Sequence, residues 1–309
     1  MSSKTKLLII DPQNDFSEVK YSFIPKYFGG INRGNGSLYV SGSNGDYNRI
    51  IYFIENNNID EIHVSLDTHT KNNISNANFW LQNNKPAKPY TILESKLKDN
   101  NIIDTNGNVC IPKNKELYEY SKEYILKLEK YGKKGNTKLV MWPLHCLEKS
   151  KGNEVVEELK LVLDKYPTKV YYHIKGQNNL TEMYSIFSAD VPLTHDNGMK
   201  TGVLKVDKYI YNGSNINVNL SGSLTYDDAS NSLNLKTTLN DKLLNNLLGE
   251  EGSWNTVYIC GQAKTHCVKN SIIDMMNYAE SINYPMKKII LLNDCTSPIP
   301  NFEDDIEDI

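Results

Sequence analysis

The chain has 309 residues, of which 34 are basic and 37 acidic, giving a net charge of -3. This balance argues against a broad electropositive surface for nucleic acid, and 39% apolar residues suffice for a packed core. The N-terminal residues resemble neither a signal sequence nor a membrane span, and the odd number of five cysteines argues against a disulfide framework. We therefore expect a cytoplasmic protein that acts on a small molecule and binds neither nucleic acid nor membranes.

The predicted elements alternate between strands and helices along the chain. Short apolar runs typical of buried strands occupy residues 6–11, 61–66, 169–174, 256–261 and 287–294, with a sixth candidate at 138–142. Helical periodicity marks residues 46–57, with Asp46 as the N-cap, 153–165 and 265–280. This order predicts an α/β fold with a doubly wound, mainly parallel β-sheet and helices on both faces.

Two segments interrupt this alternation, and we interpret them as insertions in a single domain that spans residues 1–309. The first, approximately 83–137, contains a proline-containing loop and a helical run. The second, approximately 188–238, is rich in Asn, Gly and Ser, and alternation around Asn212 and Gly213 predicts a hairpin. Insertions of this size can cover a pocket or form an interface, so a homo-oligomer is an alternative to a monomer.

Reactive side chains follow the predicted strands, at the ends where open parallel sheets bind their ligands. The first strand ends in Asp11, the second in Asp67 and His69, and the third in Lys175, while the fourth leads to Cys267. Taken singly, each has an ordinary structural explanation, such as a turn carboxylate, a solvated lysine or an inert thiol. Their occurrence together, each just after a strand, indicates a catalytic site.

Five motifs in this order carry a resemblance to a known family. They are Asp-x-Gln-x-Asp-Phe from Asp11, Asp-x-His from Asp67, Trp-Pro-x-His-Cys from Trp142, Lys-Gly from Lys175, and Gly-x-Ala-x-x-x-Cys-Val from Gly261. The set resembles the nicotinamidase branch of the isochorismatase-like cysteine hydrolases. The resemblance spans residues 6–294 and implies the isochorismatase-like hydrolase fold.

The resemblance implies a catalytic triad in which Cys267 is the nucleophile, Asp11 the general base and Lys175 the third member. It also implies an oxyanion hole formed by the backbone N–H groups of Ala263 and Cys267, and a cis peptide bond between Gln262 and Ala263. A cationic neighbour and a helix N-terminus favour the thiolate form of a cysteine. These features favour the thiolate at Cys267, which lies at the start of the helix predicted near Thr265.

One carboxylate and two imidazoles, from Asp67, His69 and His145, form a ligand set suited to a divalent transition metal. Zinc is the first expectation, and manganese and iron also fit these ligands. The resemblance implies that the ion lies in the substrate pocket and orients the substrate through a ring nitrogen, while the nucleophile is supplied by the protein.

Aromatic residues complete the predicted pocket. Phe16, Trp142 and Tyr184 match positions that surround a flat ring in the resembled family, although core packing alone would also explain them. Structural or surface roles are expected for the remaining histidines and cysteines, with His266 facing away from the nucleophile: His63, His173, His195, His266, Cys110, Cys146, Cys260 and Cys295. Thr265 is a departure, because the family usually has an acidic residue two positions before the nucleophile.

The predicted activity is hydrolysis of nicotinamide to nicotinate and ammonia, through a thioester on Cys267. One alternative is another cysteine hydrolase of the same superfamily, acting on a different amide or on a ureido group. An isochorismatase is disfavoured by the metal ligands, and a non-catalytic small-molecule-binding relative by the intact triad. Two histidines and a carboxylate also suit an iron oxygenase, but such enzymes usually have β-sandwich folds, which the βαβ order contradicts.

Overall fold

The computed structural model describes residues 2–18, 36–98, 100–133, 137–166, 169–194, 204–205, 225–227, 232–234 and 237–302. At its centre lies a five-stranded sheet in the order β15-β14-β1-β2-β9, in which all neighbouring strands pair in parallel. These strands are β1 (Thr5–Ile10), β2 (Glu61–Asp67), β9 (Lys169–Lys175), β14 (Thr256–Gly261) and β15 (Ile289–Leu291).

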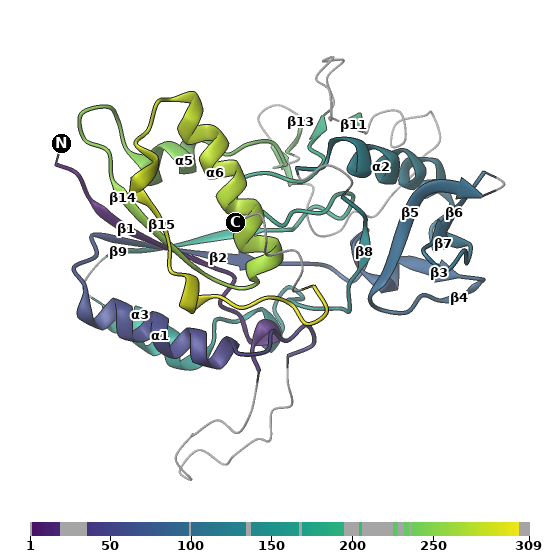
Figure 1. Ribbon diagram of the computed structural model, residues 1–309. Helices are drawn as coiled ribbons and strands as arrows, with labels where there is room; N and C mark the ends of the chain where they lie inside the picture. Colours follow the sequence, from purple (N-terminus) through teal and green to yellow (C-terminus); the bar gives the residue numbers. More distant parts are fainter. Residues whose placement is uncertain are drawn as a thin grey trace, which may run out of the picture.

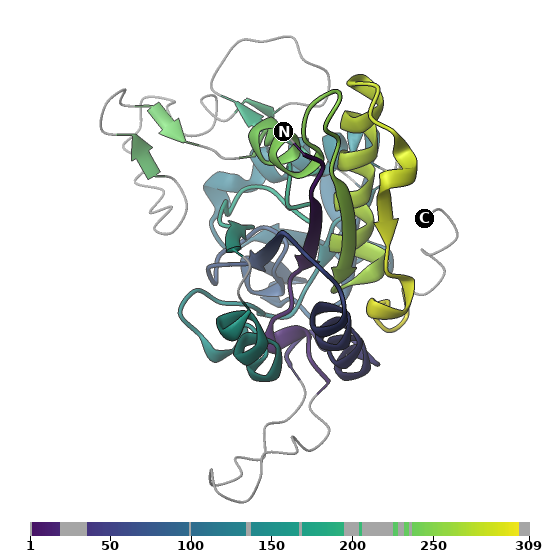
Figure 2. The ribbon, with the colours of Figure 1, turned by 90° about the vertical axis from the view of Figure 1, so that its left-hand side faces the viewer.

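Helices cover both faces of this sheet (Figures 1 and 2). They are α1 (Ser43–Asn56) and α3 (Glu157–Lys165) on one face, and α5 (Asp241–Leu248) and α6 (Lys269–Ser281) on the other. Along β1, Leu7 and Ile9 pack in the core with α1 and α3, whereas Leu8 and Ile10 pack with α5 and α6. Alternate side chains of a strand point to opposite faces, so an apolar run buries both. The predicted doubly wound α/β fold is confirmed.

The other strands lie outside the central sheet. They are β3 (Trp80–Gln82), β4 (Lys85–Pro86), β5 (Thr91–Lys98), β6 (Asn101–Asp104), β7 (Cys110–Pro112), β8 (Val140–Met141), β10 (Leu193–Thr194), β11 (Leu204–Lys205), β12 (Thr225–Asp227) and β13 (Ser232–Asn234). Strands β3 to β8 form two small sheets, which share a core with α2 (Tyr118–Tyr131) beside the central sheet (Figure 1). The predicted strand at 138–142 thus exists as β8, but it pairs with β5.

Short 3-10 turns shape several element boundaries. They occupy Asn14–Phe16, Ala77–Phe79, Lys115–Leu117, Lys151–Asn153, Met286–Lys288 and Asn293–Cys295. Two of these turns flank β15, which is therefore shorter than the predicted strand 287–294. Another turn precedes α3, which begins at Glu157 and not at the predicted residue 153.

The predicted N-cap of the first helix was wrong. Helix α1 begins at Ser43, after Gly42 in the left-handed conformation, so Asp46 lies in the first turn. Helix α5 was not predicted, because its short leucine pattern adjoins an asparagine-rich stretch. The hairpin predicted at Asn212–Gly213 lies outside the described residues, as does His195. Within the described part of the chain, every helix is too short or too polar to cross a membrane.

Candidate active site

Neighbouring parallel strands bring the predicted catalytic residues to one edge of the sheet. Asp67 ends β2 and is the direct register partner of Lys175, which ends β9. Asp11 follows β1 immediately, and β1 pairs with both β2 and β14. The turn after β14 carries Cys267. The carboxyl ends of these strands therefore place the residues within contact distance of one another.

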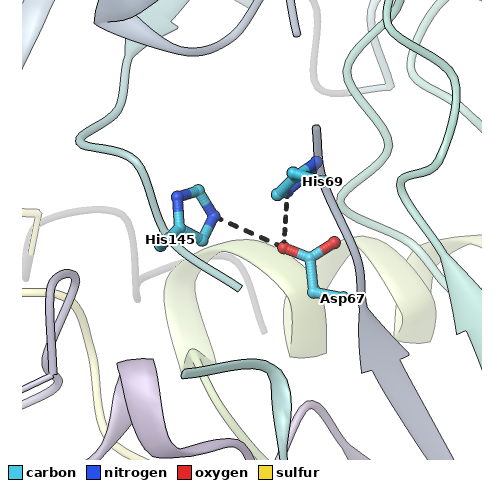
Figure 3. A group of neighbouring side chains, drawn as sticks. All are labelled: Asp67, His69 and His145. Atoms are coloured by element: carbon cyan, nitrogen blue, oxygen red, sulfur yellow. Dashed lines mark hydrogen bonds and ion pairs between the residues drawn. The ribbon is translucent and has the colours of Figure 1, made fainter. Parts of the chain in front are cut away.

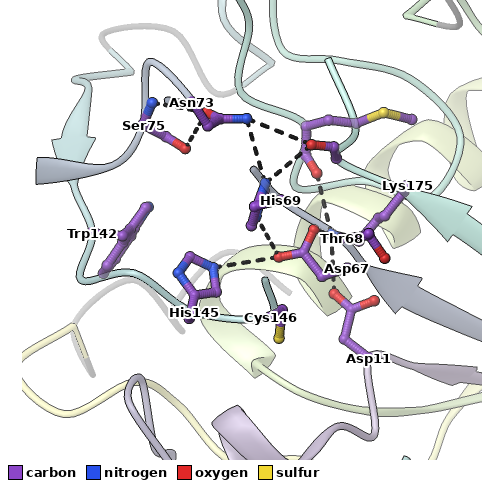
Figure 4. Close-up of polar contacts among 12 residues, drawn as sticks. Asp11, Asp67, Thr68, His69, Asn73, Ser75, Trp142, His145, Cys146 and Lys175 are labelled. Carbon is purple, nitrogen blue, oxygen red and sulfur yellow. Dashed lines mark hydrogen bonds and ion pairs between the residues drawn. The ribbon is translucent and has the colours of Figure 1, made fainter. Parts of the chain in front are cut away.

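The ammonium group of Lys175 contacts all the other reactive side chains at this edge of the sheet; Figure 4 shows Lys175 beside Asp11 and Asp67. Its Nζ atom lies 3.0 Å from Asp11 Oδ2, 2.9 Å from Asp67 Oδ1 and 3.6 Å from Cys267 Sγ, and it donates to the carbonyl of Met183 at 3.2 Å. Burial by itself would lower the pKa of Lys175, but the charges of Asp11 and Asp67 outweigh it and raise that pKa well above its ordinary value. The lysine is therefore a fixed cation.

Asp11 is held in place by Ser65, a residue of β2. The Ser65 hydroxyl accepts from the Asp11 backbone N–H at 2.9 Å and donates to Asp11 Oδ1 at 2.6 Å. These contacts leave Oδ2 directed at Lys175. Burial raises the pKa of Asp11, while Lys175 and the hydrogen bonds from Ser65 and Cys267 oppose the rise. A carboxylate with a raised pKa is a better proton acceptor than one in water, which suits a general base.

The groups around Cys267 act on its thiol in opposite directions. Burial raises the pKa of the thiol well above its ordinary value; Lys175 acts in the opposite direction, but Asp11 and Asp67 add to the rise. The positive charge of Lys175 is shared between two carboxylates and the sulfur. The thiol donates a hydrogen bond to Asp11. Asp11 is therefore placed to accept the thiol proton when the nucleophile forms, and the thiolate stays a prediction.

The turn that carries Cys267 has an unusual backbone. Gly261 has a φ of +110°, and a Cβ atom there would lie 2.1 Å from the carbonyl oxygen of Ile10, so only glycine fits. The Gln262–Ala263 peptide bond is cis, as predicted. One π-helical turn, Lys264–Val268, then leads into α6 and contains Cys267. Such turns within helices occur often at functional sites.

Asp67, His69 and His145 converge as predicted, with one ligand atom from each lying within 4.8 Å of the others (Figure 3). His69 Nδ1 lies 3.0 Å from the carbonyl of Gly176, and His145 Nδ1 lies 2.8 Å from that of Pro143. A carbonyl only accepts hydrogen bonds, so both Nδ1 atoms carry the proton.

The Nε2 atoms of both imidazoles consequently face one carboxylate oxygen. Asp67 Oδ2 lies 2.8 Å from His69 Nε2 and 3.4 Å from His145 Nε2. Two neutral imidazoles would direct lone pairs at this oxygen, an arrangement that either a proton on Nε2 or a bound cation relieves; Asp67 acts to raise the pKa of His69. The buried donor set of two nitrogens and one oxygen therefore fits a divalent transition metal.

Glycine at position 176 allows these groups to approach. Gly176 has a φ of +75°, and a Cβ atom there would lie 2.5 Å from Asp67 Oδ1 and 2.9 Å from His69 Cε1. A side chain at position 176 would displace a predicted metal ligand and disrupt the contact between Asp67 and Lys175. The Lys-Gly pair in the sequence thus reflects a steric requirement of the site.

A cavity of about 330 Å³, part of it open to solvent, is lined by two triad residues, Lys175 and Cys267, and by two of the metal ligands, Asp67 and His145. Its lining includes all three predicted aromatic residues, Phe16, Trp142 and Tyr184. Trp142 Nε1 donates to the Tyr184 hydroxyl at 3.0 Å. Ala263, one of the two residues predicted for the oxyanion hole, also lines the cavity. The roles of these residues in binding and oxyanion stabilisation stay predictions.

The interpretation of His266 as facing away was wrong, because its side chain lines the cavity beside Cys267. Sequence reasoning also missed three other lining residues, Leu38, Glu182 and Ile299. Glu182 lies two positions before Tyr184, a predicted pocket residue, and this proximity could have indicated that Glu182 also lines the cavity. Leu38 and Ile299 lie in loops far from any motif, and the sequence offers no signal for them.

The other histidines and thiols that the structure describes lie away from the cavity or inside the core. His63 and His173 stack across β2 and β9, with ring centroids 5.2 Å apart. Cys110, Cys146, Cys260 and Cys295 are free and buried. These observations agree with the structural roles expected for them.

Comparisons with known proteins agree on the fold. No protein-family model matches the sequence, and no curated protein matches it in a sequence search. Among solved structures, the yeast nicotinamidase has a TM-score of 0.50 and 20% identity, over 98% of this chain and 92% of the yeast chain. The yeast nicotinamidase bound to the inhibitor nicotinaldehyde gives a TM-score of 0.50 and 18% identity, with the same coverage. The chain therefore has the isochorismatase-like hydrolase fold, in the form that a nicotinamidase also has.

Proposed function

We propose that this protein is a cysteine amidohydrolase that converts nicotinamide and water into nicotinate and ammonia. The observation that carries the proposal is the contact of Lys175 with Asp11, Asp67 and Cys267 at one end of a cavity with aromatic walls. The fold shared with the yeast nicotinamidase supports the reaction class. The choice of nicotinamide rests on the motif resemblance and on the flat shape that aromatic walls favour.

In the proposed reaction, Asp11 first accepts the thiol proton of Cys267, and the sulfur attacks the amide carbonyl carbon. Backbone N–H groups of Ala263 and Cys267 stabilise the oxyanion. Asp11 then returns the proton to the amide nitrogen as the C–N bond breaks, which releases ammonia and leaves a thioester. A water molecule, deprotonated by Asp11, attacks the thioester, and the thiol is regenerated with release of the acid.

Lys175 keeps its proton throughout this sequence. Its charge stabilises the carboxylate form of Asp11 before each proton transfer and the sulfur anion during attack. A divalent ion held by Asp67, His69 and His145 would supply a Lewis-acidic site that orients the ring of the substrate. Phe16, Trp142 and Tyr184 stack around that ring and exclude water.

The test is ammonia release from purified protein supplied with nicotinamide and with a panel of other amides and ureido compounds. The wild type should release ammonia from nicotinamide, and Cys267→Ala should lower kcat by at least about 1,000-fold while keeping the fold. Cys110→Ala is the matched control, because Cys110 is equally buried but lies in the core of the small sheets. Undiminished turnover by Cys267→Ala would exclude the proposed nucleophile, and turnover of a different panel member would move the assignment to that substrate.

A further inference from the structure

The segment from Ser297 to Phe302 contributes Ile299 to the lining of the cavity. Ile299 lines the cavity and is 4% exposed. The half-buried ring of Phe302 lies 5.5 Å from the ring of Trp142 and 5.2 Å from that of His266, measured between centroids. These two residues lie beyond the last motif of the sequence, and neither was predicted to belong to the site.

Backbone hydrogen bonds attach this segment to the turn that carries the nucleophile. The N–H of Lys264 donates to the carbonyl of Ser297 at 2.8 Å, and the N–H of Ile299 lies 3.5 Å from the Thr265 hydroxyl. The N–H of Phe302 donates to the carbonyl of Ile299 at 3.0 Å. The segment is thus positioned relative to Cys267 by contacts only two and three residues before it.

Aromatic rings connect Phe302 to the opposite wall of the cavity. His266 makes edge contacts with Trp142 and with Tyr184, each at 5.1 Å between ring centroids, and Phe302 packs against His266 at an interplanar angle of 83°. Packed rings have little freedom to move, because each neighbour fixes the next.

We propose that Ile299 and Phe302 set the size limit of the substrate, so that the cavity accepts planar single-ring amides and excludes fused two-ring amides. This inference rests on the proposed amidohydrolase function. Ile299 acts by direct contact with the substrate. Phe302 is a positioning residue that acts through Trp142 and His266, because its ring supports both without lining the cavity itself.

The first experiment compares kcat and KM for nicotinamide and for quinoline-3-carboxamide, a fused two-ring amide. The wild type should favour nicotinamide. Ile299→Ala and Phe302→Ala should each raise the ratio of kcat/KM for the two-ring amide over nicotinamide by about tenfold or more, the scale of discrimination by apolar contacts. For nicotinamide we expect a higher KM with kcat changed by less than about threefold, because the triad is untouched.

Phe53→Ala is the matched control, since the half-buried Phe53 packs on Tyr258 in the layer of α1 and lies away from the cavity. It removes the same phenyl group and should leave the substrate ratio unchanged. An unchanged ratio in both Ile299→Ala and Phe302→Ala would overturn the inference, as would an equal change in Phe53→Ala.

A second experiment does not depend on turnover. The rate at which Cys267 reacts with iodoacetamide and with a bulky N-aryl maleimide is followed by intact mass, with Cys267→Ala identifying the signal. Ile299→Ala and Phe302→Ala should each raise the rate of the bulky reagent relative to that of the small reagent by about tenfold. If the wild type hydrolyses no amide but this selectivity changes as expected, the proposed function fails and the size limit stands. If the wild type is active and the selectivity of both variants equals that of the wild type, the size limit is refuted.

Discussion

Replacement of Lys175 by methionine tests the charge balance of the site. Lys175 is 1% exposed, and its ammonium lies 3.0 Å from Asp11 and 2.9 Å from Asp67. Removing one partner of a buried ion pair costs about 3 to 5 kcal/mol, because the other charge remains uncompensated. Methionine has a similar length, so little of the loss comes from packing. We expect Lys175→Met to lower the free energy of unfolding by about 3 to 5 kcal/mol near neutral pH.

The loss should depend on pH with a defined sign. Burial raises the pKa of Asp11, and Lys175 opposes this rise. Without Lys175, the pKa of Asp11 in the folded protein rises further above its value in the unfolded chain. A carboxyl group with a raised folded pKa loses stability as the pH increases through that pKa. The penalty of Lys175→Met should therefore be largest at about pH 8 and should shrink towards about pH 5.

Urea unfolding at both pH values measures this effect. Adding Asp11→Asn to Lys175→Met should recover part of the lost stability, because it removes the uncompensated charge. Lys160→Met is the control: its pair with Asp164 is more than half exposed, and the expected change is below about 0.5 kcal/mol. A Lys175→Met variant within about 1 kcal/mol of the wild type at both pH values would refute the reasoning, since it would mean that Asp11 is not a buried charge.

Three further predictions concern the metal, the base and the first insertion. His145→Ala should lower the affinity for a divalent metal by more than about 100-fold, and equal metal content in variant and wild type after dialysis would contradict the site. The kcat/KM for nicotinamide should fall on the acid side as Asp11, whose pKa is raised by burial, becomes protonated; a profile flat down to about pH 4 would exclude Asp11 as the base. Tyr124→Phe should lower the free energy of unfolding by about 1 to 2 kcal/mol, because the Tyr124 hydroxyl accepts from the Glu182 N–H at 2.7 Å; Tyr131→Phe, at a half-exposed ring on the same helix, is the control in urea unfolding.

The central sheet and the reactive residues could be predicted because both leave local signals. A strand buried on two faces is a short apolar run, as in Leu7 to Ile10, and the chemistry follows directly after it at Asp11. The ligand set of Asp67, His69 and His145 was accessible through residue type and motif context.

The state of the site could not be predicted, because it depends on contacts between distant segments. The sequence places a lysine near Cys267, but only the structure reveals that this lysine also neutralises Asp11 and Asp67. The direction in which His266 points is set by Trp142, Tyr184 and Phe302 together, and no pattern in the chain encodes it.

The triad and the metal ligands form one electrostatic unit, joined through Asp67. One oxygen of this carboxylate faces Lys175, and the other faces both imidazoles. A single ammonium group therefore contacts two buried carboxylates and the sulfur of Cys267. A positive charge beside the two imidazoles would offset part of the negative charge of Asp67. More of the positive charge of Lys175 would then act on Asp11 and on the sulfur of Cys267. Substitutions at Asp67 should consequently weaken metal binding and alter proton transfer at Cys267 together, although the sequence motif assigns Asp67 to the metal ligands only.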